Sequence, residues 1–352
     1  MTELRYNPVT DDWVVVATAR AKRPDGFAQR AVRQPMECPF CAGREHMTPP
    51  TVYYSGGDGE ASWRVRVFEN KYPAFAQDGR PCVRYNEIYR ALRGSGRHEV
   101  LVLSPDHAAH AGVLPVAQMR RVARAYVERY RALKELEHLR YITIITNQGE
   151  GSGATIEHPH SQIFALPVVP KAIRRECSSV LRHRKRTGEC VTCRVLAHEG
   201  NGGGRMVFRN PHFACYVPYA SAFPFELVVS PVRHMAGFGD LPDEEVDAFG
   251  AAMRRASHLI YEKLNDPPYN AFLHSAPVRE EQRLADAFHW DWHIRPVLTT
   301  LGGFEHATGL IINATRPEDC AEYLRGGDGE SHCGCAAGQC TCGCTVGGER
   351  HF

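Results

Sequence analysis

Short apolar segments rich in β-branched residues recur along the chain, each bounded by Gly, Pro or Asp, which is typical of β-strands. In the first half they are RVRVF (64–68), EVLVL (99–103), YITII (141–145) and QIFAL (162–166). Two longer segments, 115–138 and 242–266, place apolar residues three or four positions apart and carry Pro near their starts. That pattern predicts two helices.

The same series of landmarks occurs twice along the chain. Each series contains a CxxC pair, a VFxN strand, a strand ending in Ser-Pro before a His, a long helix, a strand containing Asn, and a closing His cluster. The CxxC pairs are CPFC (38–41) and CVTC (190–193). The interval from His107 to His158 is 51 residues, and that from His234 to His289 is 55. Two units of this length indicate a duplicated domain and not a solenoid.

We therefore expect an α+β fold of two tandem units, residues 1–170 and 171–325, each an antiparallel sheet with one crossing helix. Strands are too frequent for a regular alternation with helices. Residues 326–352 are rich in Gly and Cys and poor in apolar residues. We expect that tail to be disordered unless a metal organises it.

Composition narrows the classes of function. The net charge of +2 carries no global nucleic-acid signature, and no apolar run approaches the roughly 20 residues that cross a bilayer. Without a signal peptide at the start, we expect a cytoplasmic protein with neither nucleic-acid nor membrane partners. The basic run at 174–190 leaves a nucleic-acid-binding module as an alternative, although such a run is more often a solvated helix.

Thirteen cysteines in a chain without a secretion signal favour metal ligands over disulfides. A CxxC turn presents two thiolates to one Zn²⁺, and each repeat adds two equivalently placed histidines. The spacing predicts two structural zinc sites: Cys38, Cys41, His107 and His158, and then Cys190, Cys193, His234 and His289. His46 is the main rival ligand in the first unit. The tail cysteines also have a metal-binding composition: Cys333, Cys335, Cys340, Cys342 and Cys344.

The segment NQGEGSGATIEHPHSQ (147–162) carries the candidate chemistry. If His158 binds metal, His160 remains free, and a fixed neutral imidazole can attack phosphorus to form a covalent intermediate. Gln162 lies on the same side of an extended chain as His160 and can donate an N–H to a phosphate oxygen. Glycine backbone N–H groups and the hydroxyl of Thr155 can approach an anion closely.

The second repeat has lost this nucleophile. Its closing cluster, HWDWH, has Asp291 in the place of His160 and His293 in the place of Gln162. We expect this cluster to act as scaffold or as part of a substrate wall. Several other histidines are more simply surface or core residues: His98, His110, His183, His212, His258 and His274.

CPFC, SPDH, HPHSQ and an Asn147 placed eleven residues before His158 together resemble the galactose-1-phosphate uridylyltransferase branch of the histidine-triad superfamily. The resemblance runs from about residue 5 to residue 325. It implies two histidine-triad-like units, in a homodimer whose active sites are built across the interface. It also implies a ping-pong reaction in which His160 takes UMP from UDP-glucose, releases glucose 1-phosphate, and passes UMP to galactose 1-phosphate.

The resemblance further implies roles for individual residues. Gln162 would contact the α-phosphate. The substrate contacts would include Arg20 and Arg23 at the nucleotide diphosphate, Phe68 and Asn70 in the uridine segment, Phe304 and Glu305 at the hexose, and Asn147, Gly153, Thr155 and Ser161 around the phosphate.

Three departures from that branch point to relatives that include plant ADP-glucose phosphorylase. Ser161 replaces a Gly, Thr155 replaces a Ser, and the second Cys–His set replaces a metal cluster of Glu and His. Such an enzyme would load AMP on the same histidine and discharge it onto phosphate. Two further alternatives remain: a hydrolase, in which water discharges the intermediate, and a zinc-stapled nucleic-acid-binding module, in which His160 has no role.

Overall fold

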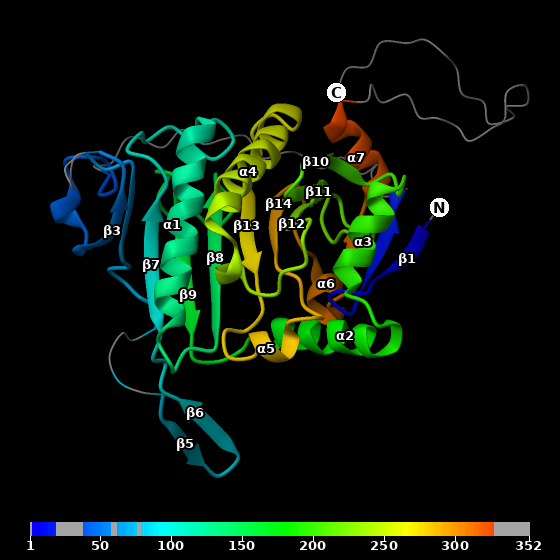
Figure 1. Ribbon diagram of the computed structural model, residues 1–352, viewed down its shortest axis with the longest axis horizontal. Helices are drawn as coiled ribbons and strands as arrows, with labels where there is room; N and C mark the ends of the chain where they lie inside the picture. Colours follow the sequence, from blue (N-terminus) through cyan, green and yellow to red (C-terminus); the bar gives the residue numbers. More distant parts are fainter. Residues whose placement is uncertain (1, 19–37, 58–61, 76–78, 80, 327–352) are drawn as a thin grey trace, which may run out of the picture.

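The computed structural model describes residues 2–18, 38–57, 62–75, 79 and 81–326. Its largest element is a ten-stranded sheet in which all neighbouring strands are antiparallel. Figure 1 shows this sheet running across the molecule. In spatial order the strands are β10 (Met206–Arg209), β11 (Phe213–Tyr216), β12 (Leu227–Pro231), β14 (Asp291–Pro296), β13 (Tyr269–His274), β8 (Tyr141–Gln148), β9 (His160–Leu166), β7 (Arg97–Val102), β4 (Val65–Glu69) and β3 (Thr51–Ser55).

The sheet consists of two halves with the same topology. The first runs β3-β4-β7-β9-β8 and the second β10-β11-β12-β14-β13, so both place their fifth strand between the third and the fourth. The halves meet where β8 pairs with β13, and Asn147 lies opposite Asn270 there. The repeats thus share one sheet, where the sequence predicted one sheet each. The junction pairs backbone groups that two separate sheets would leave exposed at an edge.

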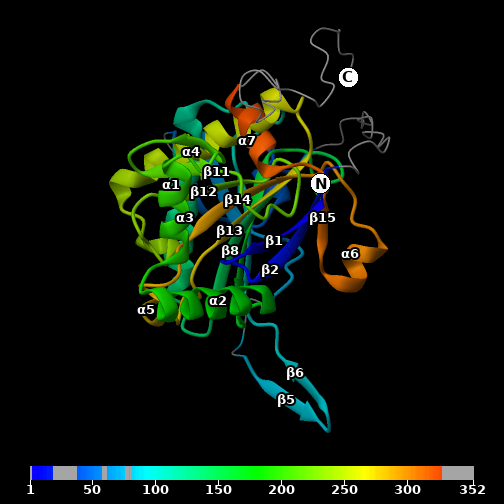
Figure 2. The same ribbon diagram turned by 90° about the vertical axis from the view of Figure 1, so that its right-hand side faces the viewer.

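Helices α1 (Val116–Lys134) and α4 (Asp243–Lys263) confirm the two helices predicted from periodicity. They lie side by side on one face of the sheet (Figures 1 and 2) and bury their apolar sides in one core that spans both halves. The close approach depends on Gly250, because a Cβ there would stand 2.7 Å from the backbone of Met119 and Arg120. A larger residue at position 250 would force the two helices apart.

The remaining elements lie around this sheet. The opposite face carries a small sheet in which β15 pairs in parallel with β2 (Figure 2). A separate hairpin, β5–β6, extends away from the body (Figures 1 and 2). These elements are β1 (Thr2–Asn7), β2 (Asp12–Ala17), β15 (Ile311–Asn313), β5 (Val83–Asn86), β6 (Tyr89–Leu92), α2 (Lys171–Thr187), α3 (Val191–Gly200), α5 (Glu281–Leu284), α6 (Gly303–Thr308) and α7 (Pro317–Arg325).

The basic run at 174–190 forms most of α2, and two of its arginines form ion pairs with carboxylates of the same fold. Arg175 forms an ion pair with Asp12, and Arg182 lies 2.7 Å from a carboxylate oxygen of Asp11. Asp11 belongs to the turn between β1 and β2, and Asp12 begins β2, so α2 docks onto the small sheet. Throughout the described ranges, every helix is too short or too polar to span a bilayer. The predicted tail, 326–352, lies outside the described residues except for Gly326.

Candidate active site and metal centres

The side chains of β9 alternate between the two faces of the sheet. Ser161 turns toward α1, where its hydroxyl lies 2.5 Å from the Tyr126 hydroxyl and 2.6 Å from Thr146 Oγ1. Because neighbouring side chains of a strand point to opposite faces, His160 and Gln162 face the side that α1 does not cover. The Ser161 hydroxyl, which the resemblance placed near the phosphate, therefore lies on the opposite face from His160.

His160 is held in one orientation and in one tautomer. Its Nδ1 lies 2.8 Å from the carbonyl oxygen of His158, and since a carbonyl can only accept, Nδ1 carries the proton. The lone pair is then on Nε2. The ring of Phe40 packs against His160 with centroids 5.2 Å apart. Burial lowers the pKa of His160 against the opposing effect of its backbone hydrogen bond, so the ring is neutral near pH 7.

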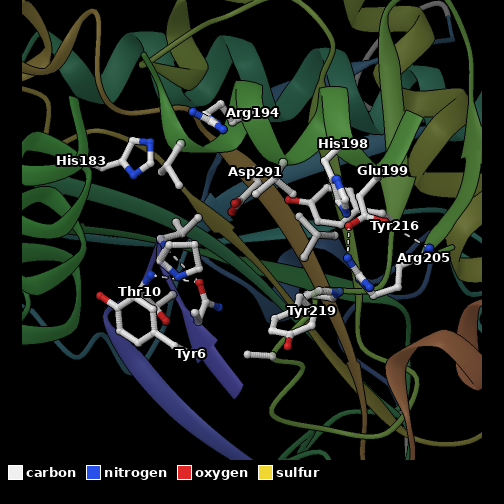
Figure 3. Close-up of a pocket in the computed structure, with 18 of the residues that line it drawn as sticks. Tyr6, Thr10, His183, Arg194, His198, Glu199, Arg205, Tyr216, Tyr219 and Asp291 are labelled. Atoms are coloured by element: carbon white, nitrogen blue, oxygen red, sulfur yellow. Dashed lines mark hydrogen bonds and ion pairs between the residues drawn. The ribbon is translucent and has the colours of Figure 1, made fainter. Parts of the chain in front are cut away.

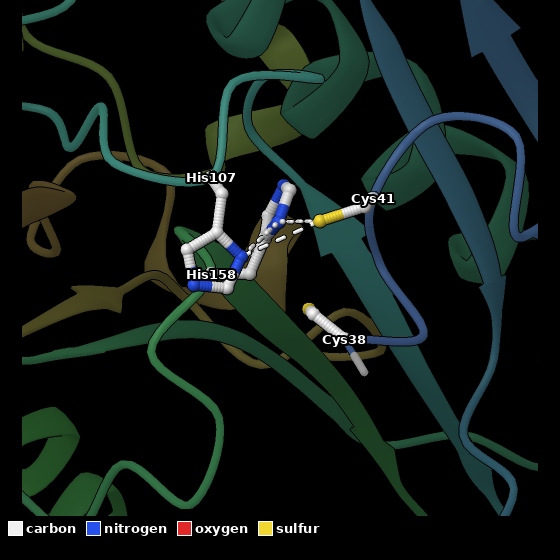
Figure 4. Close-up of side chains that lie close together, drawn as sticks. All are labelled: Cys38, Cys41, His107 and His158. Atoms are coloured by element: carbon white, nitrogen blue, oxygen red, sulfur yellow. Dashed lines mark hydrogen bonds between the residues drawn. The ribbon is translucent and has the colours of Figure 1, made fainter. Parts of the chain in front are cut away.

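The first Cys–His set is assembled as the spacing predicts (Figure 4). Cys38, Cys41, His107 and His158 each offer a ligand atom within 4.8 Å of the others, and His46 is not part of this group. Cys41 Sγ lies 3.4 Å from His107 Nδ1 and 3.6 Å from His158 Nδ1. Two thiols and two imidazoles converging on one point fit a tetrahedral metal ion such as Zn²⁺.

The tautomer of His158 suits it as a metal ligand. Its Nε2 lies 2.8 Å from the carbonyl oxygen of Ser104, so Nε2 donates and the Nδ1 lone pair faces the cysteines. Burial lowers the pKa of His158 to about 4, which keeps the ring neutral. A carbonyl that accepts the second ring N–H is the usual way in which proteins orient a ligating His.

The second Cys–His set repeats this geometry. The atoms of Cys190, Cys193, His234 and His289 again lie within 4.8 Å of one another, with Cys193 Sγ 3.4 Å from His234 Nδ1. The Nε2 atoms of His234 and His289 face the carbonyls of Ala285 and Pro231 at 2.7 and 2.9 Å. Hydrogen bonds from the Cys193 thiol and from both histidines lower the pKa of Cys190, and the same contact with Cys190 raises the pKa of Cys193.

A buried ionic network occupies the position in the second half that corresponds to His160 and Gln162. His293 lies 3.0 Å from Asp291 Oδ1 and 3.1 Å from Glu226 Oε1, and Arg295 lies 2.7 Å from the same Glu226 oxygen. Burial alone would lower the pKa of His293, but Asp291 and Glu226 outweigh it and raise the pKa to about 9. The ring is therefore a cation between two carboxylates. His274 joins Asp291 and His293 in a third group whose ligand atoms lie within 4.8 Å.

This network opens into a cavity of about 870 Å³ (Figure 3). The turn after β1, helices α2 and α3, and strand β14 form its walls. Labelled side chains that line the cavity include Tyr6, His183, Arg194, Tyr219 and Asp291. Asp291 and His293 thus line one wall of this cavity.

The Gly-rich segment before His158 forms a tight loop next to the junction of the two halves. Gly149, Gly151 and Gly153 all have positive φ, between 80° and 90°, a region that favours glycine. Asn270 Nδ2 donates to Asn147 Oδ1 at 3.0 Å and to the Ser152 carbonyl at 2.7 Å, which ties the loop to both central strands. Thr155 follows in the same loop and is exposed.

The other residues expected to contact substrate lie at different distances from His160 and in different surroundings. Asn70 lies near Gln162, because both contact His98. Phe68 is 2% exposed and packs among Phe40, Trp63, Val100 and Val102, so its ring belongs to a small core. Arg20 and Arg23 lie outside the described residues.

Phe304 and Glu305 belong to α6, on the β14 side of the sheet, and β13 and β8 lie between it and β9 (Figure 1). The Glu305 carboxylate accepts the N–H of Gly302 at 2.9 Å, a cap on its own helix, whereas the Phe304 ring is 46% exposed. Within one chain, α6 and His160 thus lie over different halves of the sheet.

Two residues of the site were not predicted from the sequence. Phe40, between the two cysteines of CPFC, packs against the rings of both His158 and His160. His98, expected to be an ordinary surface or core residue, lies 2.8 Å from Gln162 Oε1. The available signal for His98 was its place at the start of β7, the strand that ends five residues before the candidate metal ligand His107. The structure adds that Val100, two positions after His98, pairs with Gln162.

Comparisons with known proteins identify the family of this chain. The family described as "Galactose-1-phosphate uridyl transferase, N-terminal domain" matches residues 1–170. ADP-glucose phosphorylase from Arabidopsis thaliana is 33% identical over 329 residues, 92% of each chain. Galactose-1-phosphate uridylyltransferase from Thermotoga maritima is 31% identical over 335 residues, 92% of this chain and 98% of that protein. The chain belongs to the galactose-1-phosphate uridylyltransferase family. It is accordingly an enzyme of the nucleotidyltransferase type.

The solved structures support the same assignment. The crystal structure of an ADP-glucose phosphorylase from Arabidopsis thaliana with bound ADP-glucose superimposes with a TM-score of 0.81 at 31% identity, over 92% of this chain and 98% of that one. Relatives with each of the two candidate activities are thus 33% and 31% identical to this chain.

Proposed function

We propose that this chain transfers a nucleotidyl group from a nucleotide sugar through a covalent intermediate on His160. The observation that carries the proposal is the hydrogen bond from His160 Nδ1 to the His158 carbonyl, which leaves the Nε2 lone pair free on an otherwise buried ring. Nε2 would attack the α-phosphorus, forming an N–P bond as the P–O bond to hexose 1-phosphate breaks. A phosphate oxygen of the second substrate would then attack the same phosphorus and release the imidazole.

The residues around His160 support this chemistry. Gln162 faces the same side of β9 and can donate an amide N–H to a non-bridging oxygen of the α-phosphate. The glycine loop from Gly149 to Gly153, with Thr155 after it, offers backbone N–H groups and a hydroxyl on the chain that leads into β9. These groups would stabilise negative charge as the phosphorus changes partners.

We further propose that the two Cys–His sets hold structural Zn²⁺ ions. Both have four protein ligands, which leaves no open coordination position for a substrate. The ion would fix the ring and backbone of His158. The carbonyl of His158 would in turn hold His160 for attack.

The favoured overall reaction is the conversion of UDP-glucose and galactose 1-phosphate to UDP-galactose and glucose 1-phosphate, with histidine-triad-like units in a homodimer. The position of α6 supports a site built from two chains, because Phe304 and Glu305 lie beyond β8 and β13 from His160. A second candidate, phosphorolysis of ADP-glucose, is supported by the similarity to the Arabidopsis enzyme and by the second Cys–His set. Both reactions share the first half-reaction on His160.

Intact-protein mass spectrometry tests the intermediate and the base together. The protein is incubated separately with UDP-glucose and with ADP-glucose, under mildly alkaline conditions that preserve phosphorus–nitrogen bonds. A uridylyl adduct on His160 supports the first reaction, and an adenylyl adduct supports the second. The matched control, His160→Ala, should keep its zinc and its thermal midpoint and form no adduct. An adduct of ordinary yield on that variant would overturn the assignment of the nucleophile.

A further inference from the structure

His98 lies beside Gln162 on the face of the sheet that carries His160. In the register of β7 and β9, Val100 pairs with Gln162 and His98 pairs with Phe164, so His98 is the diagonal neighbour of Gln162. Diagonal cross-strand neighbours are close enough for long side chains to touch. The His98 ring is 5% exposed and stacks on Phe164 with centroids 4.0 Å apart.

One backbone contact determines the tautomer of His98. The N–H of Ala74 points at His98 Nδ1 at 3.2 Å, and a backbone N–H can only donate. Nδ1 therefore carries the lone pair, and in a neutral imidazole the proton must then be on Nε2. The other tautomer would bring two N–H groups face to face in a buried position, which costs the hydrogen bonds of both.

Among the residues that the structure describes, one side-chain oxygen lies within hydrogen-bonding distance of Nε2 and can accept its proton. Gln162 Oε1 lies 2.8 Å from Nε2. Asn70 also approaches Nε2, at 3.2 Å, but with its amide nitrogen, because its Oδ1 already accepts the N–H of Tyr72 at 2.8 Å. His98 therefore donates to Gln162, and this fixes which end of the Gln162 amide is oxygen and which is nitrogen.

We propose that His98 is a positioning residue for nucleotidyl transfer. By binding Gln162 Oε1, it leaves the amide NH₂ group of Gln162 as the end available to the α-phosphate. A free glutamine could present either its oxygen or its nitrogen, and the oxygen would repel phosphate. The inference rests on the proposed function, since it assumes that Gln162 donates to a phosphate next to His160.

The second half of the molecule uses the same pair of positions for an ionic contact. Val228 pairs with His293 as Val100 pairs with Gln162, and two residues before Val228 stands Glu226, which accepts from His293 at 3.1 Å. In both halves, then, the residue two positions before the paired valine binds the last residue of the closing cluster. At this position the first half has a neutral donor, His98, and the second half has a carboxylate, Glu226.

The tautomer is tested directly by nitrogen-15 NMR of the histidine rings in the full chain, with His98→Phe used to assign the signals. We expect His98 in the wild type to carry its proton on Nε2. A proton on Nδ1 would overturn the inference. This spectrum needs no substrate, so it remains decisive even if no nucleotidyl adduct forms and the proposed function fails.

The catalytic effect is tested by the single-turnover rate of nucleotidyl-His160 formation. His98→Phe keeps a ring to stack on Phe164 but has no donor. We expect the rate to fall about 10- to 100-fold, by analogy with the loss of a partner that orients a metal ligand. His98→Gln can accept from Ala74 and donate to Gln162, so it should recover most of the rate. Thermal midpoint and zinc content report whether each variant folds.

A double-mutant cycle separates positioning from a general effect on the fold. If His98 acts through Gln162, then His98→Phe should cost nothing further in a Gln162→Ala background. A further loss of the same size in that background, or an unchanged rate in His98→Phe alone, would overturn the proposal.

Discussion

Two histidines one residue apart adopt opposite tautomers because each is bound to a different backbone carbonyl. His158 donates from Nε2 to Ser104, so its Nδ1 lone pair faces the cysteines. His160 donates from Nδ1 to His158, so its Nε2 lone pair is free. The same residue type thereby supplies the candidate metal ligand at position 158 and the candidate nucleophile at position 160. The sequence HPH sets the spacing of the two rings, and the backbone carbonyls determine which nitrogen of each ring keeps its lone pair.

At the same scale, the His293 network gives the protein a pH-dependent stability. The folded pKa of His293, about 9, is raised from 6.5 by Asp291 and Glu226 against the effect of burial. Its contribution is therefore fully present below pH 6.5 and is lost as the pH rises through about 9. We expect His293→Gln to lower the thermal midpoint most below pH 6.5, because it leaves Asp291 buried without its cation, at a cost of about 3 kcal/mol.

Thermal unfolding of the wild type and His293→Gln across this pH range checks the prediction. The gap between the two midpoints should narrow as the pH rises through about 9. His212→Gln is the matched control, because His212 is a partly exposed histidine on the same half. A gap for His293→Gln that stays constant with pH would contradict the assigned charge.

At the scale of the element, periodicity predicts each strand and helix whose apolar side packs on the core. β4, β7, β8, β9, α1 and α4 follow from hydrophobic pattern alone. The hydrophobic pattern does not predict which strands pair with each other when the chain that connects them is long. The contact between His98 and Gln162 depends on the register of β7 and β9, and the chain between them holds a helix and a further strand. Because no short turn connects β7 and β9, the sequence does not determine their register. His98 could therefore not be recognised from the sequence as a neighbour of Gln162.

The residues of the two Cys–His sets are predictable for the opposite reason. The two cysteines of each CxxC pair are three positions apart, and each His lies within five residues of a strand of the ten-stranded sheet. We expect Cys41→Ser and Cys193→Ser each to lower the zinc content by one ion per chain and to lower the thermal midpoint, because binding the metal contributes to folding. Cys82→Ser, at an exposed cysteine outside both sets, should change neither quantity. Elemental analysis of the three variants would contradict the sites if their zinc contents were equal.

On the scale of the whole molecule, duplication yields one sheet with two unequal sites. β8 and β13 join the halves, and Asn147 and Asn270 meet at that junction. On either side, the positions of His160 and Asp291 begin equivalent strands, β9 and β14. One half carries a neutral candidate nucleophile, and the other carries a charged, buried network beside a cavity. The sequence predicts the repeat, because each unit carries the same landmarks. It does not predict the shared sheet, because the pairing of the edge strands β8 and β13 requires both units to be folded.

If α6 serves the active site of a partner chain, two inactive variants should restore each other. His160→Ala removes the nucleophile, and Phe304→Asp alters an exposed residue in the first turn of α6, where an acidic side chain suits the helix. In a mixed dimer, both defects would fall in one site and leave the other intact. Random mixing makes half of the dimers mixed, so activity should return to about a quarter of the wild-type value. Mixtures of either variant with itself supply the control. If the chain sediments as a monomer, or if mixing after exchange of subunits restores nothing, α6 serves its own chain or has no part in the site.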